Sequence, residues 1–180
     1  MSLIELPKPD QSVLARRDEI VKDLRKLVPE ALLISDAQGR RTYESDALTA
    51  YRGVPLAVLL PSTTEEVSKI LRYCHQHRVK VVPRGAGTSL CGGALPLQDS
   101  IVLGISRMNR VLEVDPINRV ARVGTGITNI GISQAVAAQG FFYAPDPSSQ
   151  LACTLAGNIG TNAGGAHCLK YGVTVNNLQG

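Results

Sequence analysis

Residues 84–93 read RGAGTSLCGG and residues 155–165 read LAGNIGTNAGG, and the interpretation of the whole chain starts from these two glycine-dense segments. Each segment places glycines beside short hydroxyl or amide side chains. Because glycine has no Cβ, the backbone N–H groups of such a segment can approach an anion closely and donate to it from several directions. The pair therefore predicts two loops that wrap a large phosphate-bearing cofactor.

Each segment also has a simpler interpretation. The first could be a flexible surface loop, and the second a compact turn-rich connection, because glycine and asparagine are common turn residues. A P-loop that hydrolyses nucleoside triphosphates is disfavoured, since the chain contains no Gly-Lys-Ser or Gly-Lys-Thr. Anion binding is favoured because the first segment follows an apolar run directly, and because Asn158 and Asn162 add donors and acceptors to the second.

The residues before the first segment predict a strand, a helix and a second strand. Residues 57–60 and 80–82 are short apolar runs, and a proline stops each of them. Between them, Thr63 and Glu66 form the pattern of a capping box, which predicts a helix over residues 65–77. A βαβ unit places the first glycine segment just beyond the carboxyl end of a strand, where α/β sheets commonly bind ligands.

The rest of the chain predicts a mixture of helices and strands. Apolar residues at helical spacing indicate an amphipathic opening helix over residues 13–28, which Pro29 ends. Further elements are a strand at 101–105, a hairpin of 111–114 and 120–123, a helix at 132–138 and irregular backbone at 145–149.

Composition and charge exclude several classes of protein. The net charge of +4 comes from scattered basic patches, and only 4% of residues are aromatic, which disfavours a nucleic-acid interface. No apolar run reaches the roughly 18 residues that cross a bilayer, and the start MSLIELPKPDQS lacks the order of a secretory signal, so we expect a cytoplasmic protein. The cysteines form no CxxC pair that would indicate zinc or an iron–sulfur cluster, so we expect reduced thiols and no metal. They are Cys74, Cys91, Cys153 and Cys168.

One familiar motif fails on inspection. Gly124-Thr125-Gly126 follows a predicted strand, which suggests the dinucleotide fingerprint of a Rossmann fold. The third glycine position holds Asn129, however, and Asp146 lies between two prolines rather than at the end of a strand. We therefore reject the Rossmann interpretation.

The order of the motifs resembles a known family. The segments PRGAGTS, PDPSS, T-x-x-GN-x-x-TNAGG and KYG occur in this order over residues 83–172. They resemble the FAD-binding domain of the vanillyl-alcohol-oxidase/PCMH superfamily. The strings YRGVP, GGALPL, ISQAV, YAPDPSSQ and HCLKYG look most like the flavin subunits of bacterial glycolate oxidases, and the resemblance spans residues 50–180.

The resemblance implies an α+β fold, a PCMH-type FAD-binding domain made of two small α/β subdomains with the flavin between them. We expect residues 1–49 to be an amino-terminal helical extension and residues 50–180 to be the FAD-binding domain. Residues 173–180 show no pattern of a closing helix or strand. We therefore expect the second subdomain to be truncated and the chain to be a fragment of a longer protein.

The resemblance also implies a set of cofactor-binding residues. The first segment would hold the FAD pyrophosphate, and the later segments would line the flavin and close its pocket. No histidine lies in the first segment, where some relatives attach flavin covalently, so non-covalent FAD is expected. The residues are Pro83, Arg84, Gly85, Ala86, Gly87, Thr88, Ser89, Pro147, Ser148, Ser149, Thr154, Gly157, Asn158, Gly160, Thr161, Asn162, Gly164, Gly165, Tyr171 and Gly172.

The activity that the resemblance implies is oxidation of a small 2-hydroxy acid, glycolate first, to the 2-oxo acid. A hydride would pass from Cα to flavin N5 while a protein base takes the hydroxyl proton. The base and the substrate-binding cap are expected beyond Gly180, so no residue here is assigned a catalytic role and the fragment alone should be inactive.

Two other functions stay open. One is a D-lactate or D-2-hydroxyglutarate dehydrogenase of the same fold, and the other is a non-catalytic nucleotide-binding module. An iron–sulfur subunit is the expected electron acceptor, and through such partners the cytoplasmic protein could lie peripheral to the inner membrane.

Overall fold

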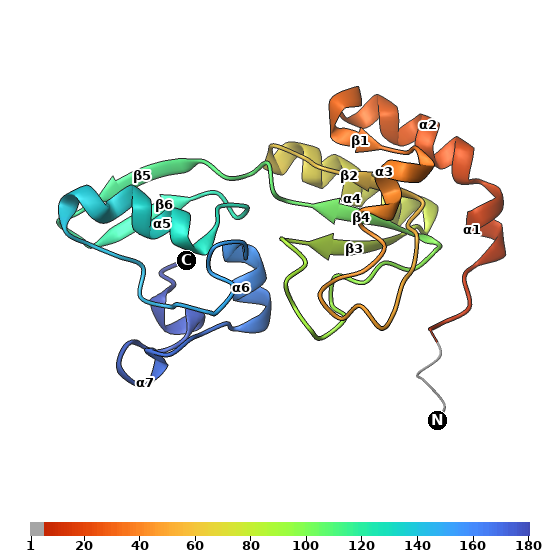
Figure 1. Ribbon diagram of the computed structural model, residues 1–180. Coiled ribbons are helices and arrows are strands. Elements are labelled where there is room, and N and C mark those ends of the chain that lie inside the picture. The colour runs from red at the N-terminus through yellow and green to blue at the C-terminus, as the bar shows by residue number, and fades with distance from the viewer. Residues whose placement is uncertain (1–5) are drawn as a thin grey trace. The chain divides into compact units, whose positions relative to one another are not determined.

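The computed structural model describes residues 6–180, which form two compact units (Figure 1). The first unit comprises the chain up to Arg84 together with Ser89–Gly104. The second comprises Gly85–Thr88 together with Ile105–Gly180. Four residues of the first glycine segment therefore belong to the same unit as the whole second segment.

The first unit contains a four-stranded sheet in the order β1-β2-β4-β3. Its strands are β1 (Leu33–Ile34), β2 (Ala57–Leu59), β3 (Lys80–Arg84) and β4 (Ser100–Gly104). β1 is antiparallel to β2, whereas β2 and β3 each pair in parallel with β4. The predicted strand–helix–strand unit is thus present, but its two strands are not neighbours, because the later strand β4 lies between them.

Within residues 6–104, four helices accompany this sheet: α1 (Gln11–Ala15), α2 (Arg17–Leu27), α3 (Ala37–Arg41) and α4 (Thr64–His77), with a 3-10 turn at Glu30–Leu32. The expectation of one helix over residues 13–28 is wrong. The chain leaves helical geometry at Arg16, where φ is −97° and ψ is 12°, and the N–H of Arg16 bonds to the carbonyl of Val13. No helix within residues 6–180 is long and apolar enough to cross a membrane.

The core of the first unit lies between its helices and its sheet. Ile20 and Leu24 of α2 and Ile70 of α4 pack on alternate residues of β2 and β4, including Leu59 and Ile101, all fully buried. Each such buried aliphatic side chain contributes about 1.5–3 kcal/mol. The intervening residues of these strands are also buried, outside this cluster, so both strands are covered on both faces, as continuous apolar runs predict.

The N-terminus of α4 is capped nearly as the sequence predicts. The Thr63 hydroxyl accepts a hydrogen bond from the N–H of Glu66 at 3.2 Å. The Glu66 carboxylate reaches back to the N–H of Ser62 at 2.7 Å, one residue before the cap. The bond from Glu66 satisfies a donor that the first helical turn leaves free, and the bond from Ser62 holds the chain just before the cap, which together fix where α4 begins.

The second unit contains an antiparallel hairpin of β5 (Val111–Asp115) and β6 (Val120–Val123), as predicted. The Asp115 carboxylate accepts from the N–H of Asn118 at 3.0 Å and so closes the turn between them. The helices are α5 (Asn129–Val136), α6 (Leu155–Thr161) and α7 (Cys168–Tyr171), with 3-10 turns at Ala137–Gln139 and Thr174–Asn177.

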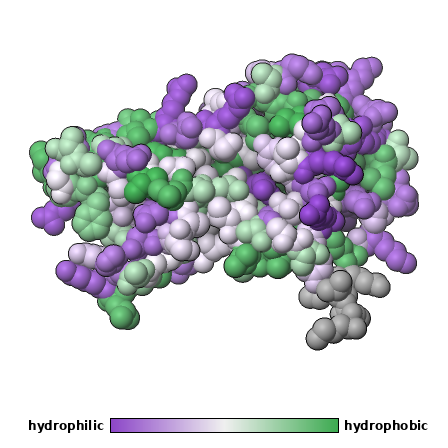
Figure 2. Space-filling view, in the orientation of Figure 1, coloured by the Kyte–Doolittle hydropathy of each residue, from purple (hydrophilic) through white to green (hydrophobic). Residues whose placement is uncertain are grey.

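The core of the second unit is small. Its buried cluster consists of Ile127, Ile132 and Leu155. Large apolar side chains of this unit reach the surface instead, among them Phe142 and Leu169, and Figure 2 shows apolar patches around α5 and α7. The mixed composition of both units confirms the α+β class; the domain boundary at residue 50 stays a prediction.

The second glycine segment differs from its prediction. We expected a loop over residues 155–165, but Leu155–Thr161 form α6 and only the remainder is irregular. Gly157 and Gly160 lower helix propensity. The cap by Thr154, whose hydroxyl accepts from the N–H of Gly157 at 3.3 Å, and backbone bonds to the preceding part of the unit outweigh that cost.

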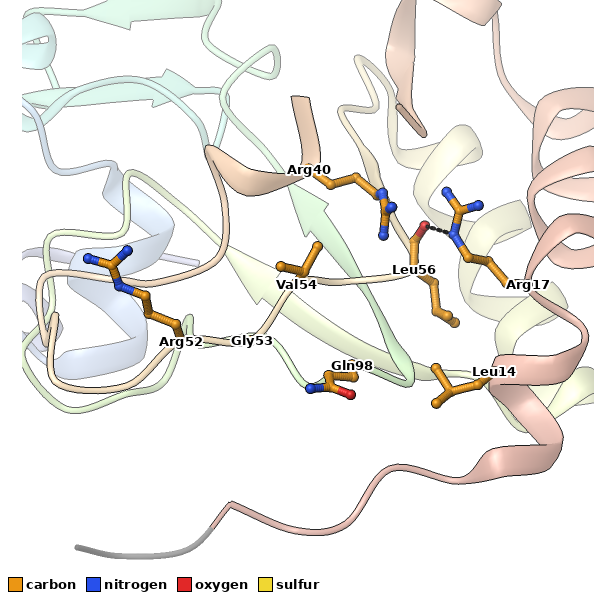
Figure 3. A pocket seen from close by; sticks show the side chains of 8 residues that line it. All are labelled: Leu14, Arg17, Arg40, Arg52, Gly53, Val54, Leu56 and Gln98. Carbon is orange, nitrogen blue, oxygen red and sulfur yellow. Dashed lines mark hydrogen bonds between the residues drawn. The ribbon is translucent and has the colours of Figure 1, made fainter. Parts of the chain in front are cut away.

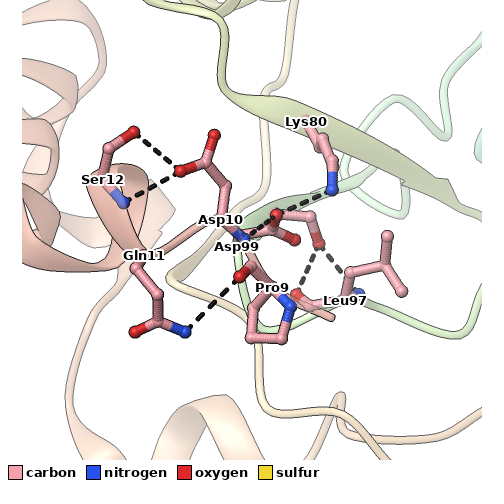
Figure 4. Close-up of polar contacts among 8 residues, drawn as sticks. Pro9, Asp10, Gln11, Ser12, Lys80, Leu97 and Asp99 are labelled. Atoms are coloured by element: carbon pink, nitrogen blue, oxygen red, sulfur yellow. Dashed lines mark hydrogen bonds and ion pairs between the residues drawn. The ribbon is translucent and has the colours of Figure 1, made fainter. Parts of the chain in front are cut away.

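Side-chain hydrogen bonds of Arg17 and Asp99 connect separate elements of the first unit. Arg17 of α2 donates from Nε to the carbonyl of Leu56 at 3.2 Å, just before β2 (Figure 3). Asp99, whose side chain is 1% exposed, accepts from Lys80 Nζ of β3 at 2.7 Å and from the N–H of Asp10 at 2.8 Å (Figure 4). The same carboxylate therefore connects the start of α1 with β3 and β4.

The environment of Asp99 favours its charged form. Burial by itself would raise the pKa of Asp99, but the hydrogen bonds from Lys80 and Asp10 outweigh burial and hold this pKa below its ordinary value. The stability that the carboxylate provides is then fully present above its unfolded-state pKa of about 3.9. It is lost as the pH falls through the lowered pKa of the folded state.

We predict that Asp99→Asn lowers the free energy of unfolding at neutral pH by about 1.5–3 kcal/mol, the range for hydrogen bonds to charged groups. The difference from the wild type should shrink at acidic pH, where the wild-type carboxylate is itself protonated. Urea unfolding at neutral and acidic pH measures both effects.

The control for this prediction is Glu30→Gln, which breaks the exposed pair of Glu30 with Arg25. Exposed pairs contribute under about 1 kcal/mol, so this variant should unfold almost like the wild type. An Asp99→Asn protein as stable as Glu30→Gln at neutral pH would contradict the role of the buried carboxylate.

Candidate functional site

The two glycine segments meet at Gly85. A Cβ built on Gly85 would overlap the hydroxyl of Thr154 and would lie 3.7 Å from the backbone N of Gly157. Thr154 is the residue that caps α6. Only a glycine at position 85 therefore lets the first segment pass this close to the start of the second.

The backbone of Gly85–Thr88 carries donors without acceptors. None of the N–H groups of these four residues donates to another group within residues 6–180. Gly87 has a φ of 73°, which turns the chain so that the segment curves. A curved run of free N–H groups is the arrangement that binds a phosphate through the backbone.

The second segment differs, because the backbone donors at the start of α6 are already used. Leu155 and Ala156 donate to the carbonyls of Ile127 and Thr125 at 2.9 and 3.0 Å, and the N–H of Gly157 donates to Thr154. A backbone cradle comparable to the first segment is therefore not formed by α6. What this helix offers is a surface without side chains at Gly160, where an added Cβ would meet nothing within 4 Å.

Asn158 provides the second segment with a polar group. Its side chain is buried, and Nδ2 has no hydrogen-bond partner among the described residues. A buried amide without a partner costs about 1–3 kcal/mol, so such groups usually have an acceptor in the functional state. The hydroxyl of Thr161, three residues later, is already used, since it donates to the carbonyl of Gly157 at 3.0 Å.

Residues 145–149 are irregular, as predicted, and Asn129 holds them in place. The Asn129 side chain is buried, and its Nδ2 donates to the carbonyl of Pro145 at 2.9 Å. Its own N–H donates to the carbonyl of Cys153 at 3.0 Å. The sequence shows Asn129 only as the residue that breaks a dinucleotide fingerprint, so its positioning role was missed.

Asp146 connects this stretch with the end of the second glycine segment. Its carboxylate lies 2.6 Å from His167 Nδ1 and accepts from the N–H of His167 at 3.3 Å. The hydrogen bond with His167 holds the pKa of Asp146 below its ordinary value. Gly165 packs so closely on the backbone of Asp146 that a Cβ there would overlap it. Sequence reasoning also missed this connection.

The remaining residues of the second segment have structural contacts. Asn162 ends α6 in the left-handed region, with φ of 47°, and its side-chain oxygen accepts from the N–H of Val175 at 3.0 Å. Gly164 lies against the side chains of Cys168 and Val173. These contacts shape the turn after α6, while the N–H of Gly164 and Nδ2 of Asn162 donate to no group within residues 6–180.

The last predicted residues lie at the end of α7. Gly172 has a φ of 77°, a conformation that favours glycine. The Tyr171 ring contacts Phe142 edge-on, with 5.9 Å between the centroids. Tyr171 is partly exposed, and Lys170 Nζ lies over its ring, 5.0 Å from the centroid.

Three predicted residues, Pro83, Arg84 and Ser89, belong to the first unit. The Arg84 guanidinium donates to the carbonyl of Ser45 at 2.7 Å and lies over the ring of Tyr43, 5.5 Å from its centroid. The contacts of this side chain are therefore with residues of the first unit. The cofactor role of all twenty predicted residues stays a prediction.

Comparison with known proteins gives a consistent result. A model of the FAD binding domain family matches residues 55–180. The chain is 50% identical over 162 residues to the glycolate oxidase subunit GlcD of Escherichia coli (strain K12), covering 90% of this chain and 32% of that protein. It is 44% identical over 160 residues to GlcD of Bacillus subtilis (strain 168), covering 86% of this chain and 34% of that protein.

Proteins with lower identities to this chain are named as other enzymes. The mitochondrial D-2-hydroxyglutarate dehydrogenase of Arabidopsis thaliana is 32% identical over 152 residues, with 84% of this chain and 27% of that protein covered. Among solved structures, an alkyldihydroxyacetonephosphate synthase superposes with a TM-score of 0.79 at 26% identity, covering 94% of this chain and 33% of that one. The chain thus spans about a third of the length of the curated relatives it matches.

The residues present fit FAD. The free N–H groups of Gly85–Thr88 suit a diphosphate, and the side-chain-free surface at Gly160 suits a flat ring or a sugar. The unpartnered Asn158 Nδ2 suits a carbonyl or phosphate oxygen of the same ligand.

We predict that Gly85→Ala weakens FAD binding about 5-fold or more, because the new Cβ must displace Thr154 and with it a helix cap worth about 1 kcal/mol. Titration of the apoprotein with FAD, followed by quenching of flavin fluorescence, measures the dissociation constant. The matched control is Gly93→Ala, where a Cβ would meet nothing within 4 Å. Equal affinities of the two variants would contradict the close approach of the segments.

Proposed function

The chain belongs to the FAD binding domain family, and from this premise we propose that it is the FAD-binding part of a longer enzyme that oxidises glycolate to the corresponding 2-oxo acid. The observation that carries the proposal is the 50% identity to a glycolate oxidase subunit over 162 residues, 90% of this chain. FAD, when bound, supplies the two-electron acceptor for such an oxidation.

The residues of this chain would bind and orient the cofactor. Gly85–Thr88 would donate N–H groups to the pyrophosphate, Asn158 would donate its free amide hydrogens, and Asn129 would keep residues 145–149 in place. Binding would be non-covalent, since no histidine lies in the first segment. The groups that bind substrate and take its proton would lie in the part of the protein that follows this domain in its longer relatives.

Two named relatives support a second candidate with the same chemistry. A D-lactate dehydrogenase of Anaerostipes hadrus and the plant D-2-hydroxyglutarate dehydrogenase each share 32% identity with this chain. Both substrates are 2-hydroxy acids, so the class of reaction would be unchanged and only the substrate-binding part would differ. The lower identity makes these substrates the less supported choice.

The relatives with the higher identities are named as subunits, which supports a protein that works in a complex. We extend the proposal to an iron–sulfur subunit that accepts electrons from the reduced enzyme. Such a partner would separate the oxidation of the acid from the final electron acceptor.

The test uses the complete FAD-loaded protein, mixed anaerobically with glycolate, D-lactate or D-2-hydroxyglutarate while the oxidised flavin band is followed. We predict that the second-order rate constant for bleaching by glycolate is at least about 10-fold above that for D-lactate. A site shaped for glycolate would have to accommodate the additional methyl group of D-lactate.

Other outcomes are decisive as well. If D-lactate or D-2-hydroxyglutarate bleached the band faster than glycolate, that acid would be the substrate and glycolate would not. A protein that binds FAD fully but is reduced by none of the three acids would support a non-catalytic nucleotide-binding module instead.

A further inference from the structure

A cavity of about 400 Å³ opens in the first unit, and none of its lining residues belongs to the glycine segments (Figure 3). Three arginines line it from different parts of the chain: Arg17 from α2, Arg40 from α3 and Arg52 from the stretch before β2. Leu14 and Leu56 give it an apolar part. No acidic residue is among the described residues that line this cavity.

Backbone carbonyls fix two of these arginines. Arg17 donates from Nη2 to the carbonyl of Ser35 at 2.6 Å, in addition to its bond with Leu56. Arg40 donates from Nη1 to the carbonyl of Pro55 at 2.8 Å. A carbonyl oxygen orients a guanidinium without cancelling its charge, so both cations are held in place for a further partner.

Each of these arginines has a carboxylate nearby, but none of these carboxylates lines the cavity. Asp18 pairs with Arg17 at 3.1 Å, but its side chain is 97% exposed, and such pairs are weak. Asp36 lies near Arg40, yet its Oδ1 accepts from the N–H of Gly39 at 2.7 Å and caps α3. Glu44 pairs with Arg52 at 2.9 Å, outside the set of lining residues.

Arg17 and Arg40 are also close enough to repel each other. Burial first, and the charge of Arg17 second, hold the pKa of Arg40 below its ordinary value. Nη2 of Arg40 donates to no group within the part of the chain that the structure describes. An anion placed between the two guanidinium groups would relieve the repulsion and would accept the free donors.

We propose that this cavity is a second binding site, which takes a small organic anion. Its carboxylate or phosphate would lie between Arg17 and Arg40, with Arg52 adding charge, and its apolar body would pack on Leu14 and Leu56. The volume is within the range of small-molecule sites, roughly 300–1,000 Å³. The site is independent of FAD, and the proposal does not rest on the proposed oxidation.

The test titrates the complete FAD-loaded protein with two probes, butyrate and inorganic phosphate, at constant ionic strength in a calorimeter. We expect saturable binding of at least one probe; preference for butyrate would assign a carboxylate, and preference for phosphate a phosphate ester. Arg40→Gln should weaken binding at least about 10-fold, as loss of a charge-assisted hydrogen bond does. Arg41→Gln, the neighbouring exposed arginine that does not line the cavity, should bind like the wild type.

Two further variants cover a failure of Arg40→Gln to fold. Arg40→Lys keeps the charge but loses the planar fork and should bind with intermediate affinity. Arg52→Gln, which removes an exposed arginine, should weaken binding about 3-fold or more through the loss of nearby charge. Three results would each overturn the proposal: no saturable binding of either probe by the folded wild type, equal binding by the neutral analogue butyramide, or equal losses in the variants at positions 40 and 41.

Discussion

The close approach of the Gly85 backbone to Thr154 is the constraint on which the rest of the site depends. Thr154 caps α6 and also forms an antiparallel bridge with Thr128, which caps α5. One small region therefore fixes where two helices begin and where the first glycine segment passes. Any side chain at Gly85 would force apart segments that are distant in sequence.

The two glycine segments offer a ligand different groups. Gly85–Thr88 present N–H groups that nothing in residues 6–180 accepts, whereas the N–H groups at the start of α6 are all bonded within the unit. The second segment contributes a surface without side chains at Gly160 and the free amide of Asn158. A ligand bound as we propose would meet backbone donors on one segment, and on the other open space at Gly160 and the unpartnered amide of Asn158.

The sequence predicted the elements that local patterns determine. The strands β2, β3 and β4 and the helix α4 were predicted within a few residues, because apolar runs between prolines and the Thr63 cap are signals carried by neighbouring residues. The order of the strands was not predictable in this way, since insertion of β4 between β2 and β3 depends on which runs are buried together.

In the site, too, local features were predictable from the sequence and features that depend on distant residues were not. The glycine segments and their order were visible in the sequence, and with them the family. Helix α6 was missed because Gly157 and Gly160 disfavour a helix locally, while the bonds to Thr125 and Ile127 that stabilise it come from elsewhere in the chain. The pair of Asp146 and His167 is likewise formed by residues far apart in sequence, and no local signal indicates it.

Amide hydrogen exchange of the complete protein, with and without FAD, tests the central claim most directly. If the free N–H groups of Gly85–Thr88 bind the diphosphate, their exchange should slow strongly when FAD is added, while the amides of α6, already bonded, should change little. Unchanged exchange at residues 85–88 in the presence of saturating FAD would contradict the account.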